Sequence, residues 1–461
     1  MHNTSVVIMA GGRGERFWPK SSAGQPKHFL RLVGDKALLR LTYERIADML
    51  PPERIMVVTV QEQVSMARGE LPELPKHNFI AEPYGNDTAS CMCLASAVVE
   101  ARADTENVLF LPADHYIGNV DVYQAILSKA VGCLAHSSVV TVGIPPTRPE
   151  TAYGYIETGS GISDGVFEIA SFREKPSPEV AHEFFSSGKH FWNGGIFCWN
   201  NAKLSAAVRE VFPEGCAIYD SVLESRSIVE AYKQVPRISF DYAVMQKYKG
   251  MGLVVRADNL IWDDLGSWTA LERLVKPDES GNYVHGIAQL IDSRDCIVYS
   301  DDPCTVVMGA SGLVVAHTDD GVLVSSREHL PLIREPVRAL SSAQHQSAAS
   351  LSADQKVVQK PWGSEIWWGV TDHYLGKILE VRAGHRLSLQ YHEKKTETMY
   401  CLSGHGLLQL GEEEVVMRPG TSRTITCGTV HRLTALSDLR ILEVSTPDPD
   451  DVVRVEDDYC R

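Results

Sequence analysis

Residues 5–30, SVVIMAGGRGERFWPKSSAGQPKHFL, decide the fold of the amino-terminal part of this chain. Val6–Met9 form a short apolar run, which is typical of a strand covered on both faces of a sheet. The loop behind it carries three glycines, Gly11, Gly12 and Gly14. Because glycine accepts positive φ, such a loop can turn its N–H groups toward an anion. Three basic residues follow at close spacing: Arg13, Arg16 and Lys27. The segment therefore predicts a strand followed by a phosphate-binding loop.

Two better-known glycine motifs do not fit this loop. A dinucleotide-binding fingerprint needs a third glycine where Phe17 stands, and a helix where Pro19 would interrupt it. A Walker loop needs Gly-Lys-Ser/Thr, whereas Gly188-Lys189 is followed by His190 and Gly376-Lys377 by Ile378. The segment instead resembles the G-G-x-G-x-R-F/L-W-P…P-K-x-F-L signature of the sugar-1-phosphate nucleotidylyltransferases, specifically the mannose-1-phosphate guanylyltransferases. The alternative is a glycine turn with surface arginines, but the motif spacing is maintained as far as Leu30.

Bulk properties exclude several classes of protein. The chain has 461 residues, of which 44% are hydrophobic and 22% charged, and at ~100–200 residues per domain we expect two to four domains. A net charge of −15 argues against nucleic-acid binding, which requires a basic face. The ten cysteines are scattered without a paired zinc motif, so we expect them to be reduced. No apolar run approaches the ~20 residues of a membrane span, and the start lacks a cationic region. We therefore expect a cytoplasmic protein without a membrane segment.

The first part of the chain has an α/β pattern. Short apolar runs alternate with amphipathic segments, which predicts a mostly parallel sheet layered by helices, with strands at 5–10, 55–60, 107–112 and 138–143. One apolar stripe at helical spacing consists of Leu39, Tyr43, Ile46 and Leu50. Another helix is expected to reach Ala101, with Asp87 or Thr88 as its N-cap. The family resemblance implies a Rossmann-like nucleotidyltransferase domain over residues 1–276.

The rest of the chain is rich in β-type patterns. Residues 277–340 contain short runs such as CTVVMG and GLVVAH between turn residues, which predicts a small all-β unit. The resemblance implies a short left-handed β-helix there. Residues 341–356 are rich in Ser, Ala and Gln and are interpreted as a linker, either helical or flexible. Residues 357–461 alternate almost continuously and predict a separate β-barrel domain.

Asp114 is the first candidate metal ligand. It ends the apolar run Val108–Ala113, so its carboxylate should lie at the carboxyl edge of a parallel strand, where α/β sheets bind ligands. The surrounding L-P-A-D-H segment resembles the family's Mg²⁺-binding motif, and the alternative role is a helix cap. Because one carboxylate rarely fixes Mg²⁺ alone, a second is expected. Likeness to the family's W-x-D-L-G-x-W segment selects Asp264 over the adjacent Asp263.

Three segments resemble the sugar-binding regions of the family. Glu174-Lys175-Pro176 resembles the E-K-P motif, whose lysine contacts the phosphate of the sugar 1-phosphate. A tripeptide alone is weak evidence, but this one lies between segments that resemble the G-Y-x-E and W-N-x-G stretches. The resemblance implies sugar binding by Tyr153, Gly154, Glu157, Glu174, Asn193 and Gly194.

The resemblance also implies a nucleotide site and a reaction. Likeness to an E-P…N-T-A segment implicates Glu82, Asn86 and Thr88 beside the base, although composition does not distinguish guanine from other bases. The phosphates would lie against the loop of Ala10, Gly11, Gly12, Arg13 and Gly14. The implied activity is transfer of GMP from GTP to mannose 1-phosphate, which gives GDP-mannose and pyrophosphate. Its catalytic residues would be Arg16, Lys27, Asp114, Lys175 and Asp264, with Mg²⁺ as cofactor.

A second site is expected in the carboxy-terminal barrel. Gln390 and His392 are two apart in a predicted strand and so share a face, while Glu397 and His431 follow. Such a set suits Zn²⁺ or another first-row metal. The spacing resembles the cupin motifs, and the domain resembles the type II phosphomannose isomerase domain fused to guanylyltransferases. It departs from that pattern at Lys395, where arginine is usual, and at Cys460, where glycine is usual.

Several alternatives stay open at this point. The barrel is either an isomerase that interconverts mannose 6-phosphate and fructose 6-phosphate or a non-catalytic sugar-sensing cupin. The transferase could use another sugar 1-phosphate or nucleotide, or the chain could be a silent sugar-nucleotide binding protein. Retention of the catalytic set argues against silence. The expected partners are small molecules, with no nucleic acid and no membrane, and the sequence leaves a homo-oligomer open.

Overall fold

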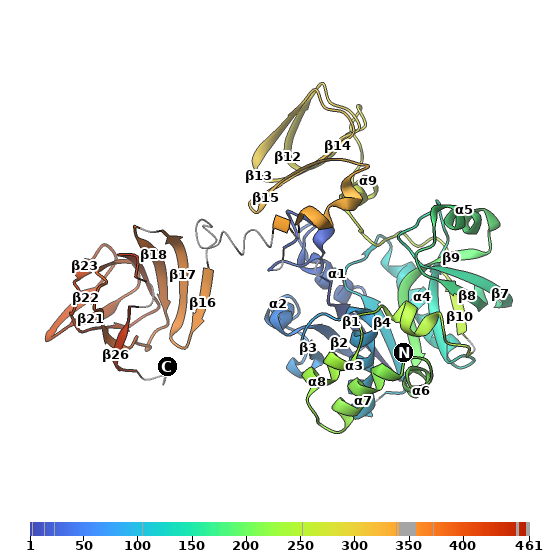
Figure 1. The fold of residues 1–461 in the computed structure, drawn as a ribbon, viewed down its shortest axis with the longest axis horizontal. Helices are drawn as coiled ribbons and strands as arrows, with labels where there is room; N and C mark the ends of the chain where they lie inside the picture. The colour runs from blue at the N-terminus through green and yellow to red at the C-terminus, as the bar shows by residue number, and fades with distance from the viewer. Residues whose placement is uncertain are drawn as a thin grey trace. The chain divides into compact units, whose positions relative to one another are not determined.

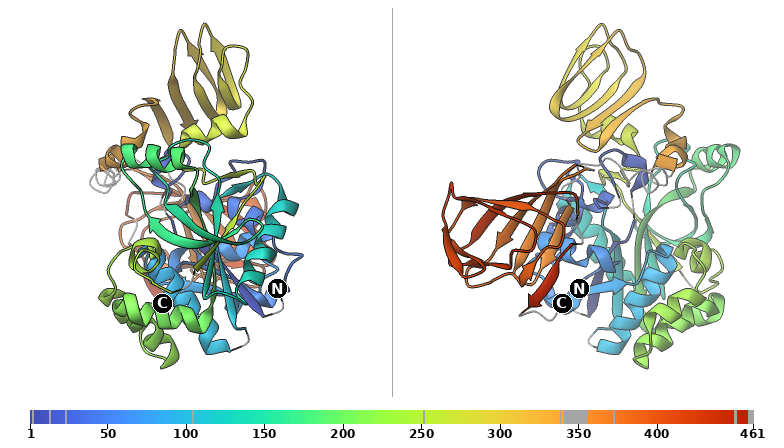
Figure 2. Two further views of the ribbon diagram at one scale, coloured as in Figure 1. Left: turned by 90° about the vertical axis from the view of Figure 1, so that its right-hand side faces the viewer. Right: turned by 60° about the vertical axis from the view of Figure 1, so that its left-hand side comes forward.

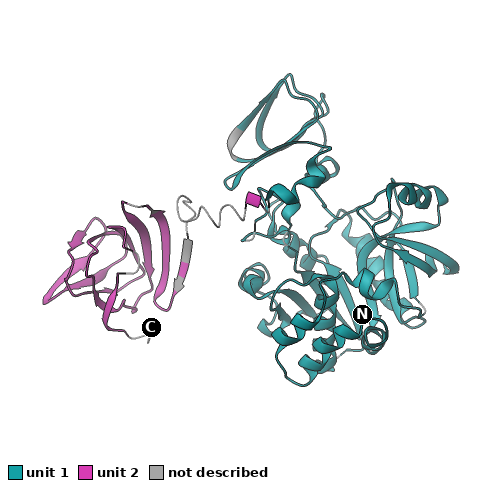
Figure 3. Ribbon diagram, viewed as in Figure 1, with its two compact units in different colours: residues 1–337 teal, residues 338–461 magenta. Residues whose placement is uncertain are grey.

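The computed structural model describes residues 1, 3–12, 14–22, 24–103, 105–250, 252–337, 339–340, 356–371, 373–448 and 451–457. The chain divides into two compact units, Met1–Val337 and Arg338–Arg461 (Figure 3). Arg13, the expected linker up to residue 355 and the chain end from Asp458 lie outside the described residues. Within the described ranges, no helix has the length and apolar character needed to cross a membrane.

The first unit is built on one nine-stranded sheet (Figure 1). Its strands are β1 (Thr4–Ala10), β2 (Ile55–Val60), β3 (Phe79–Glu82), β4 (Asn107–Pro112), β6 (Val139–Ile144), β7 (Tyr155–Ser163), β8 (Val166–Arg173), β9 (His190–Asn200) and β10 (Gly252–Arg256). The order is β3-β2-β1-β4-β9-β6-β10-β8-β7. Strands β3 to β4 are parallel, as are β6 and β10, whereas β9 runs antiparallel between β4 and β6. The four predicted strands are confirmed within one residue.

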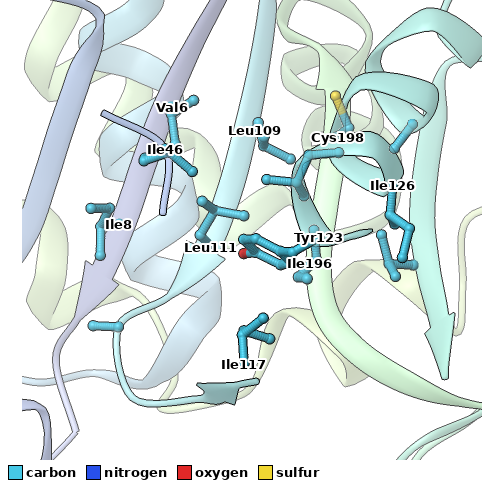
Figure 4. Close-up of a cluster of buried hydrophobic side chains, with 14 of the residues drawn as sticks. Val6, Ile8, Ile46, Leu109, Leu111, Ile117, Tyr123, Ile126, Ile196 and Cys198 are labelled. Atoms are coloured by element: carbon cyan, nitrogen blue, oxygen red, sulfur yellow. The ribbon is translucent and has the colours of Figure 1, made fainter. Parts of the chain in front are cut away.

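Helices cover both faces of this sheet. The helices of this part are α1 (Leu38–Glu44), α2 (Val64–Glu70), α3 (Asp87–Arg102), α4 (Val120–Cys133), α5 (Pro178–Ser187), α6 (Asn201–Val211), α7 (Cys216–Leu223) and α8 (Ile228–Gln234). The short helix α9 (Leu271–Leu274) belongs to a separate core, with Trp268 and Ile297. Val6 and Ile8 of β1 pack with Tyr123 and Ile126 of α4 in one core (Figure 4), whereas Val7 packs with residues of α3 in the other. The alternation of β1 therefore divides its side chains between two helical layers.

Two expected helix boundaries differ from the structure. The helix expected through Leu50 ends at Glu44, although Ile46 and Leu50 are still buried in the core. The expectation of Asp87 or Thr88 as an N-cap is wrong, because α3 begins at Asp87 and Asn86 takes that position. The Asn86 amide does not cap the helix, since it donates to Ser90 Oγ and to the carbonyl of Val235.

The predicted small β unit is confirmed (Figure 2), and it belongs to the first unit (Figure 3). Its strands are β12 (Tyr283–Ile291), β13 (Ile297–Met308), β14 (Leu313–Thr318) and β15 (Gly321–Ser326). β12, β13 and β14 pair in parallel in succession, as turns of a solenoid do, and β15 pairs antiparallel with β14. Its inner residues Ile297, Tyr299 and Val314 share a core with Phe17 and Trp268, so the solenoid packs against the loop that follows β1.

The second unit consists of two facing antiparallel sheets, as expected for a barrel. One sheet contains β16 (Lys356–Lys360), β17 (Gly363–Val370), β18 (Leu375–Val381), β25 (Leu439–Ser445), β20 (Glu397–Ser403) and β23 (Ser422–Ile425), in that order. The other contains β22 (Glu413–Met417), β21 (Gly406–Leu410), β24 (His431–Ala435), β19 (Leu389–Tyr391) and β26 (Val453–Glu456). Residues of both sheets, including Leu379, Ile441, Leu408 and Leu433, form one apolar core.

Candidate functional site

The loop after β1 is closed tightly onto Lys27. Gly14 has a φ of +68°, and a Cβ there would lie 2.5 Å from the Cβ of Lys27 and 2.8 Å from its backbone nitrogen. The carbonyl of Gly14 also accepts from Ser21 Oγ at 2.6 Å. Only glycine can both adopt this positive φ and let the backbone come so close to Lys27. Gly14 therefore helps to hold Lys27 in place.

Lys27 joins the two segments that carry the candidate metal ligands. Its buried ammonium group lies 2.8 Å from Asp114 Oδ2 and donates to the main-chain carbonyl of Asp264 at 2.5 Å. Asp114 follows β4 at the carboxyl edge of the parallel strands, as expected. The structure therefore brings together Lys27, Asp114 and Asp264, which are far apart in the sequence.

The charge of Asp114 is strongly stabilised. Burial by itself would raise the pKa of this carboxyl, but the Lys27 ammonium, together with His115 and His28, lowers the pKa to about 2. Asp114 is consequently ionised throughout the neutral range. An anionic oxygen pair at this sheet edge suits either an ammonium partner or a hard divalent cation.

Asp263 and Asp264 have separate partners. Asp263 accepts a bidentate interaction from the Arg273 guanidinium and a hydrogen bond from Leu265 N. Asp264 Oδ1 accepts from the Tyr153 hydroxyl at 2.6 Å and from Gly266 N at 3.1 Å. The two neighbouring carboxylates thus face different surroundings, as strand alternation predicts.

An aromatic group surrounds Asp264. Tyr153 packs edge-on against Trp192 and Trp262, with ring centroids 5.1 and 5.4 Å away. Trp262 Nε1 donates to Nδ1 of His115 at 3.2 Å, and burial lowers the pKa of His115, which favours the neutral ring. His115 was missed as a functional candidate, although it stands in the quoted L-P-A-D-H segment directly after Asp114.

The residues expected to bind the sugar form a second group. Lys175 Nζ lies 2.5 Å from Oε1 of the buried Glu174, and a Cβ at Gly154 would lie 2.5 Å from Glu174 Oε2. Asn193 N donates to the carbonyl of Gly154 at 2.8 Å, which ties β9 to the start of β7. A residue missed by sequence reasoning joins this group, because Asn193 Nδ2 donates to Asp241 Oδ1 at 2.9 Å.

Two other expected sugar-binding residues have structural partners. Glu157 accepts a hydrogen bond from Ser171 Oγ at 2.7 Å across the β7–β8 pair. A Cβ at Gly194 would lie 2.9 Å from the carbonyl oxygen of Val142, so this glycine allows β9 to approach β6. Their roles toward a sugar stay predictions.

The residues expected beside the base lie around the start of α3. Glu82 ends β3, is 2% exposed, and accepts a hydrogen bond from the Tyr232 hydroxyl at 3.1 Å. A Cβ at Gly11 would lie 3.1 Å from Glu82 Oε2, so the glycine loop passes directly over this carboxyl. Burial raises the pKa of Glu82 to about 7. Thr88 Oγ1 accepts from Phe240 N at 2.8 Å.

Arg16 also points to the Asp264 segment. Its guanidinium lies 3.5 Å from the carbonyl oxygen of Gly266, at the long limit of a hydrogen bond. Arg16, Lys27 and the 264–266 segment therefore meet at one side of the glycine loop. Arg13, the third expected cation, lies outside the described residues.

The expected ligands of the second unit form a compact buried cluster. Ligand atoms of His392, Glu397 and His431 all lie within 4.8 Å of one another, and the three side chains are at most 2% exposed. His392 Nε2 and His431 Nε2 each lie 3.2 Å from a different oxygen of Glu397. Within the described residues, His392 Nε2 and Glu397 Oε1 lack a partner with hydrogen-bond geometry. Buried, unpartnered imidazole and carboxylate groups that converge in this way fit a divalent metal.

Backbone contacts orient this cluster. His392 Nδ1 contacts the carbonyl of Asp451, and His431 Nδ1 lies 3.0 Å from the carbonyl of Thr429, which turns both Nε2 atoms inward. Gln390, the fourth expected ligand, is beside them, with Nε2 3.5 Å from His431 Nε2 and Oε1 accepting from Ser388 Oγ.

Buried charges extend from the cluster into the barrel. Lys395 Nζ lies 2.7 Å from Glu397 Oε2 and 3.6 Å from Glu443 Oε1, which in turn is 3.0 Å from Lys377 Nζ. Lys377 and Glu443 were missed, although both occupy inward positions of alternating strands. Charged side chains at inward positions would have been the available signal.

Comparison with known proteins supports the division of the chain. Family models describe residues 5–280 as a nucleotidyl transferase, 287–340 as a mannose-phosphate isomerase/GMP-like β-helix domain, and 347–457 as a mannose-6-phosphate isomerase C-terminal domain. Mannose-1-phosphate guanylyltransferase of Klebsiella pneumoniae is 31% identical over 474 residues, which cover 99% of each chain. Alginate biosynthesis protein AlgA of Pseudomonas aeruginosa is 30% identical over 99% of this chain and 97% of its own length.

A solved structure is also similar. The crystal structure of a protein described as a mannose-1-phosphate geranyltransferase from Thermus thermophilus matches with a TM-score of 0.69 and 37% identity, over 74% of this chain and 99% of that chain. Families of both kinds commonly employ divalent metals, in agreement with the two carboxylate-containing sites. The chain belongs to the nucleotidyl transferase family, and within it to the mannose-1-phosphate guanylyltransferases that carry a mannose-6-phosphate isomerase-type C-terminal domain.

Proposed function

We propose that the first unit transfers GMP from GTP to mannose 1-phosphate, which gives GDP-mannose and pyrophosphate. The observation that carries this proposal is the convergence of Lys27, Asp114 and Asp264 beside the glycine loop, in a chain with guanylyltransferase relatives over its full length. The names of the alginate and xanthan relatives suggest polysaccharide synthesis as the use of the product.

The reaction needs positioning and charge neutralisation rather than a base. An ionised phosphate oxygen of mannose 1-phosphate attacks the α-phosphorus of GTP, and the bond to the pyrophosphate oxygen breaks. We assign Arg16 and Lys27 to the leaving pyrophosphate and Lys175 to the phosphate of the attacking sugar. Arg13 has the same expected role as Arg16 but lies outside the described residues.

Asp114 and Asp264 would hold Mg²⁺. Among the described residues, Asp114 Oδ1 and Asp264 Oδ2 make no hydrogen bond, so each carboxylate keeps an oxygen for a cation. An all-oxygen donor set suits Mg²⁺ better than a soft metal. Bound there, Mg²⁺ would neutralise charge that develops around the α-phosphate. Lys27, which pairs with Asp114, would then be released toward the nucleotide phosphates.

The test is a nucleotide panel with the purified full-length protein. Pyrophosphate release is measured with mannose 1-phosphate, Mg²⁺ and each nucleoside triphosphate in turn. We expect GTP to be preferred, and Asp114→Asn to lower kcat/KM by ~10²-fold or more. Release with another nucleotide but not with GTP, or near-normal turnover of Asp114→Asn at saturating Mg²⁺, would contradict the proposal.

For the second unit we propose metal-dependent interconversion of mannose 6-phosphate and fructose 6-phosphate. The buried His392, Glu397 and His431 cluster favours this activity, because aldose–ketose isomerisation benefits from a polarised carbonyl oxygen. Purified protein is incubated with mannose 6-phosphate and Zn²⁺ or other divalent metals. Fructose 6-phosphate is the expected product. Its absence under conditions that support the transferase reaction would leave a sugar-binding barrel without isomerase activity.

A further inference from the structure

The segment Val235–Asp241 connects the two groups of the first unit. Its beginning lies along the start of α3, where the base is expected to bind. Asn86 Nδ2 donates to the carbonyl of Val235 at 3.0 Å, and Phe240 N donates to Thr88 Oγ1 at 2.8 Å. Residues 235–240 are thus held by the same side chains that the family resemblance assigns to the nucleotide.

The next residue reaches the sugar group. Asp241 begins a π-helical turn, Asp241–Met245, and its Oδ1 accepts from Asn193 Nδ2 at 2.9 Å. The other end of the Asn193 amide is also fixed, because Oδ1 accepts from Gly195 N at 3.1 Å. Asp241 therefore decides which way the Asn193 amide points. Single π-turns of this kind are common at functional sites.

Two carboxylates meet in this place. Burial and the charge of Glu174 raise the pKa of Asp241 to about 7, although Lys175 and Asn193 oppose this effect. Glu174 is 8% exposed, while Asp241 and Asn193 are partly accessible. A pair of carboxylates beside an amide is rich in hydrogen-bond acceptors. Such a set suits the hydroxyl groups of a sugar, whereas the neighbouring Lys175 suits its phosphate.

We propose that Asp241 is a specificity residue of the sugar site, where its carboxylate accepts a hydrogen bond from a sugar hydroxyl and holds Asn193 in the binding orientation. The proposal rests on the proposed function, since it requires a sugar 1-phosphate to bind beside Lys175. It adds a residue that neither the motifs nor the family resemblance had assigned. It also explains why residues 235–241 are held between the nucleotide and sugar residues.

The test compares Asp241→Asn with Asp220→Asn. The first substitution keeps size and removes the acceptor charge, while the second removes the same charge from an exposed carboxylate on α7 that is 3.5 Å from Arg209. For Asp241→Asn we expect the KM for mannose 1-phosphate to rise ~10-fold or more, with the KM for GTP within about twofold of wild type. Calorimetric binding of mannose 1-phosphate should weaken by the same factor. Asp220→Asn should resemble wild type in both measurements.

Deoxy analogues separate recognition from a purely structural role. Mannose 1-phosphates that lack one hydroxyl are tested as substrates of wild type and Asp241→Asn. For one analogue, kcat/KM should be ~10-fold or more below that for mannose 1-phosphate with wild type. With the variant the same analogue should lose little, because the hydroxyl and its acceptor act as a pair. Equal losses in both proteins for every analogue, or equal rises in KM for GTP and sugar, would overturn the inference. Wild-type turnover of mannose 1-phosphate is measured first. If the proposed function is wrong, wild type itself shows no turnover; if only the inference is wrong, wild type turns over and Asp241→Asn does not differ from it in the way described.

Discussion

Glu82 combines burial with a position under the glycine loop, and this has a consequence for stability. Its pKa is about 7 in the folded protein, because burial disfavours its charge, and 4.5 is its ordinary value. The folded protein therefore binds more protons than the unfolded chain between these values. Its free energy of unfolding should fall as the pH rises from 4.5 to 7. At ~1.4 kcal/mol per pH unit, the full loss is on the order of 3 kcal/mol.

Glu82→Gln should remove this pH dependence. Urea unfolding of the first unit is measured at pH 5 and pH 8 for wild type and the variant. We expect wild type to lose ~3 kcal/mol relative to Glu82→Gln between these conditions, since the neutral amide has no charge to bury. If the free energy of unfolding changes with pH by the same amount in the two proteins, Glu82 is not the titrating group.

Gly14 offers a second test at a single residue, with a matched control in the same unit. Gly14 and Gly34 have φ of +68° and +69°, but a Cβ at Gly34 meets nothing within 4 Å. Gly34→Ala should therefore cost only ~1–2 kcal/mol of unfolding free energy for the left-handed backbone. Gly14→Ala should cost more, and should lower kcat/KM by ~10²-fold because Lys27 is displaced. Similar losses in both variants, with full activity retained, would show that the loop does not position Lys27.

Residue-level reasoning found the candidates that belong to contiguous motifs. Lys27, Asp114 and Asp264 were predicted and do lie together, since each stands in a segment whose order and spacing can be read from the chain. Asp241 could not be found in this way. Its significance comes from a contact with Asn193 across the fold, and nothing in its neighbours Phe240 and Tyr242 points to that contact.

At the scale of elements, Trp268 links the glycine loop to the solenoid strands. Its indole packs 5.2 Å from the ring of Phe17 and 4.9 Å from that of Tyr299, and Nε1 donates to the carbonyl of Trp18 at 2.9 Å. Trp268→Phe keeps most of the packing but loses this hydrogen bond. We expect it to lower the free energy of unfolding by ~1 kcal/mol and to raise the KM for GTP, because the loop is less well anchored.

Trp199→Phe is the control for this substitution. Trp199 is fully buried in the same unit, but its Nε1 has no hydrogen-bond partner among the described residues. The change should therefore remove packing without removing a hydrogen bond, and should leave the KM for GTP unchanged. Chemical denaturation and steady-state kinetics measure both effects. An unchanged KM for GTP in Trp268→Phe would show that the contact between the solenoid and the glycine loop does not affect nucleotide binding.

Helices and strands that are determined by their local sequence could be predicted, whereas those that depend on contacts with residues distant in the sequence could not. β1, β2, β4 and β6 were predicted because buried parallel strands read as uninterrupted apolar runs. β9 was not, and its HFWNGGIFCWN sequence mixes polar and glycine residues with aromatic ones. β9 lies antiparallel between β4 and β6 because it pairs with strands that are distant in the sequence, and the local sequence pattern carries no information about such pairing. The early end of α1 at Glu44 likewise depends on tertiary packing, since Ile46 and Leu50 stay buried outside a regular helix.

For the whole molecule, the two compact units predict separable responses to metal. The cluster of His392, Glu397 and His431 lies entirely within the second unit, whereas Asp114 and Asp264 lie in the first. Zn²⁺ that binds only the folded second unit stabilises it by ~2.7 kcal/mol at a hundredfold excess over Kd. For a domain of this size that corresponds to a rise of roughly 10 °C in the thermal midpoint.

Calorimetry of the full chain should therefore show one unfolding transition that moves with Zn²⁺ and is reversed by a chelator, and another that does not move. His431→Ala should abolish the shift, because it removes one of three converging ligands. His405→Ala, at an exposed histidine of the same unit, should retain it. Both variants should form GDP-mannose at the wild-type rate, since the transferase residues belong to the first unit. A shift that persists in His431→Ala, or that disappears equally in His405→Ala, would place the metal outside this cluster.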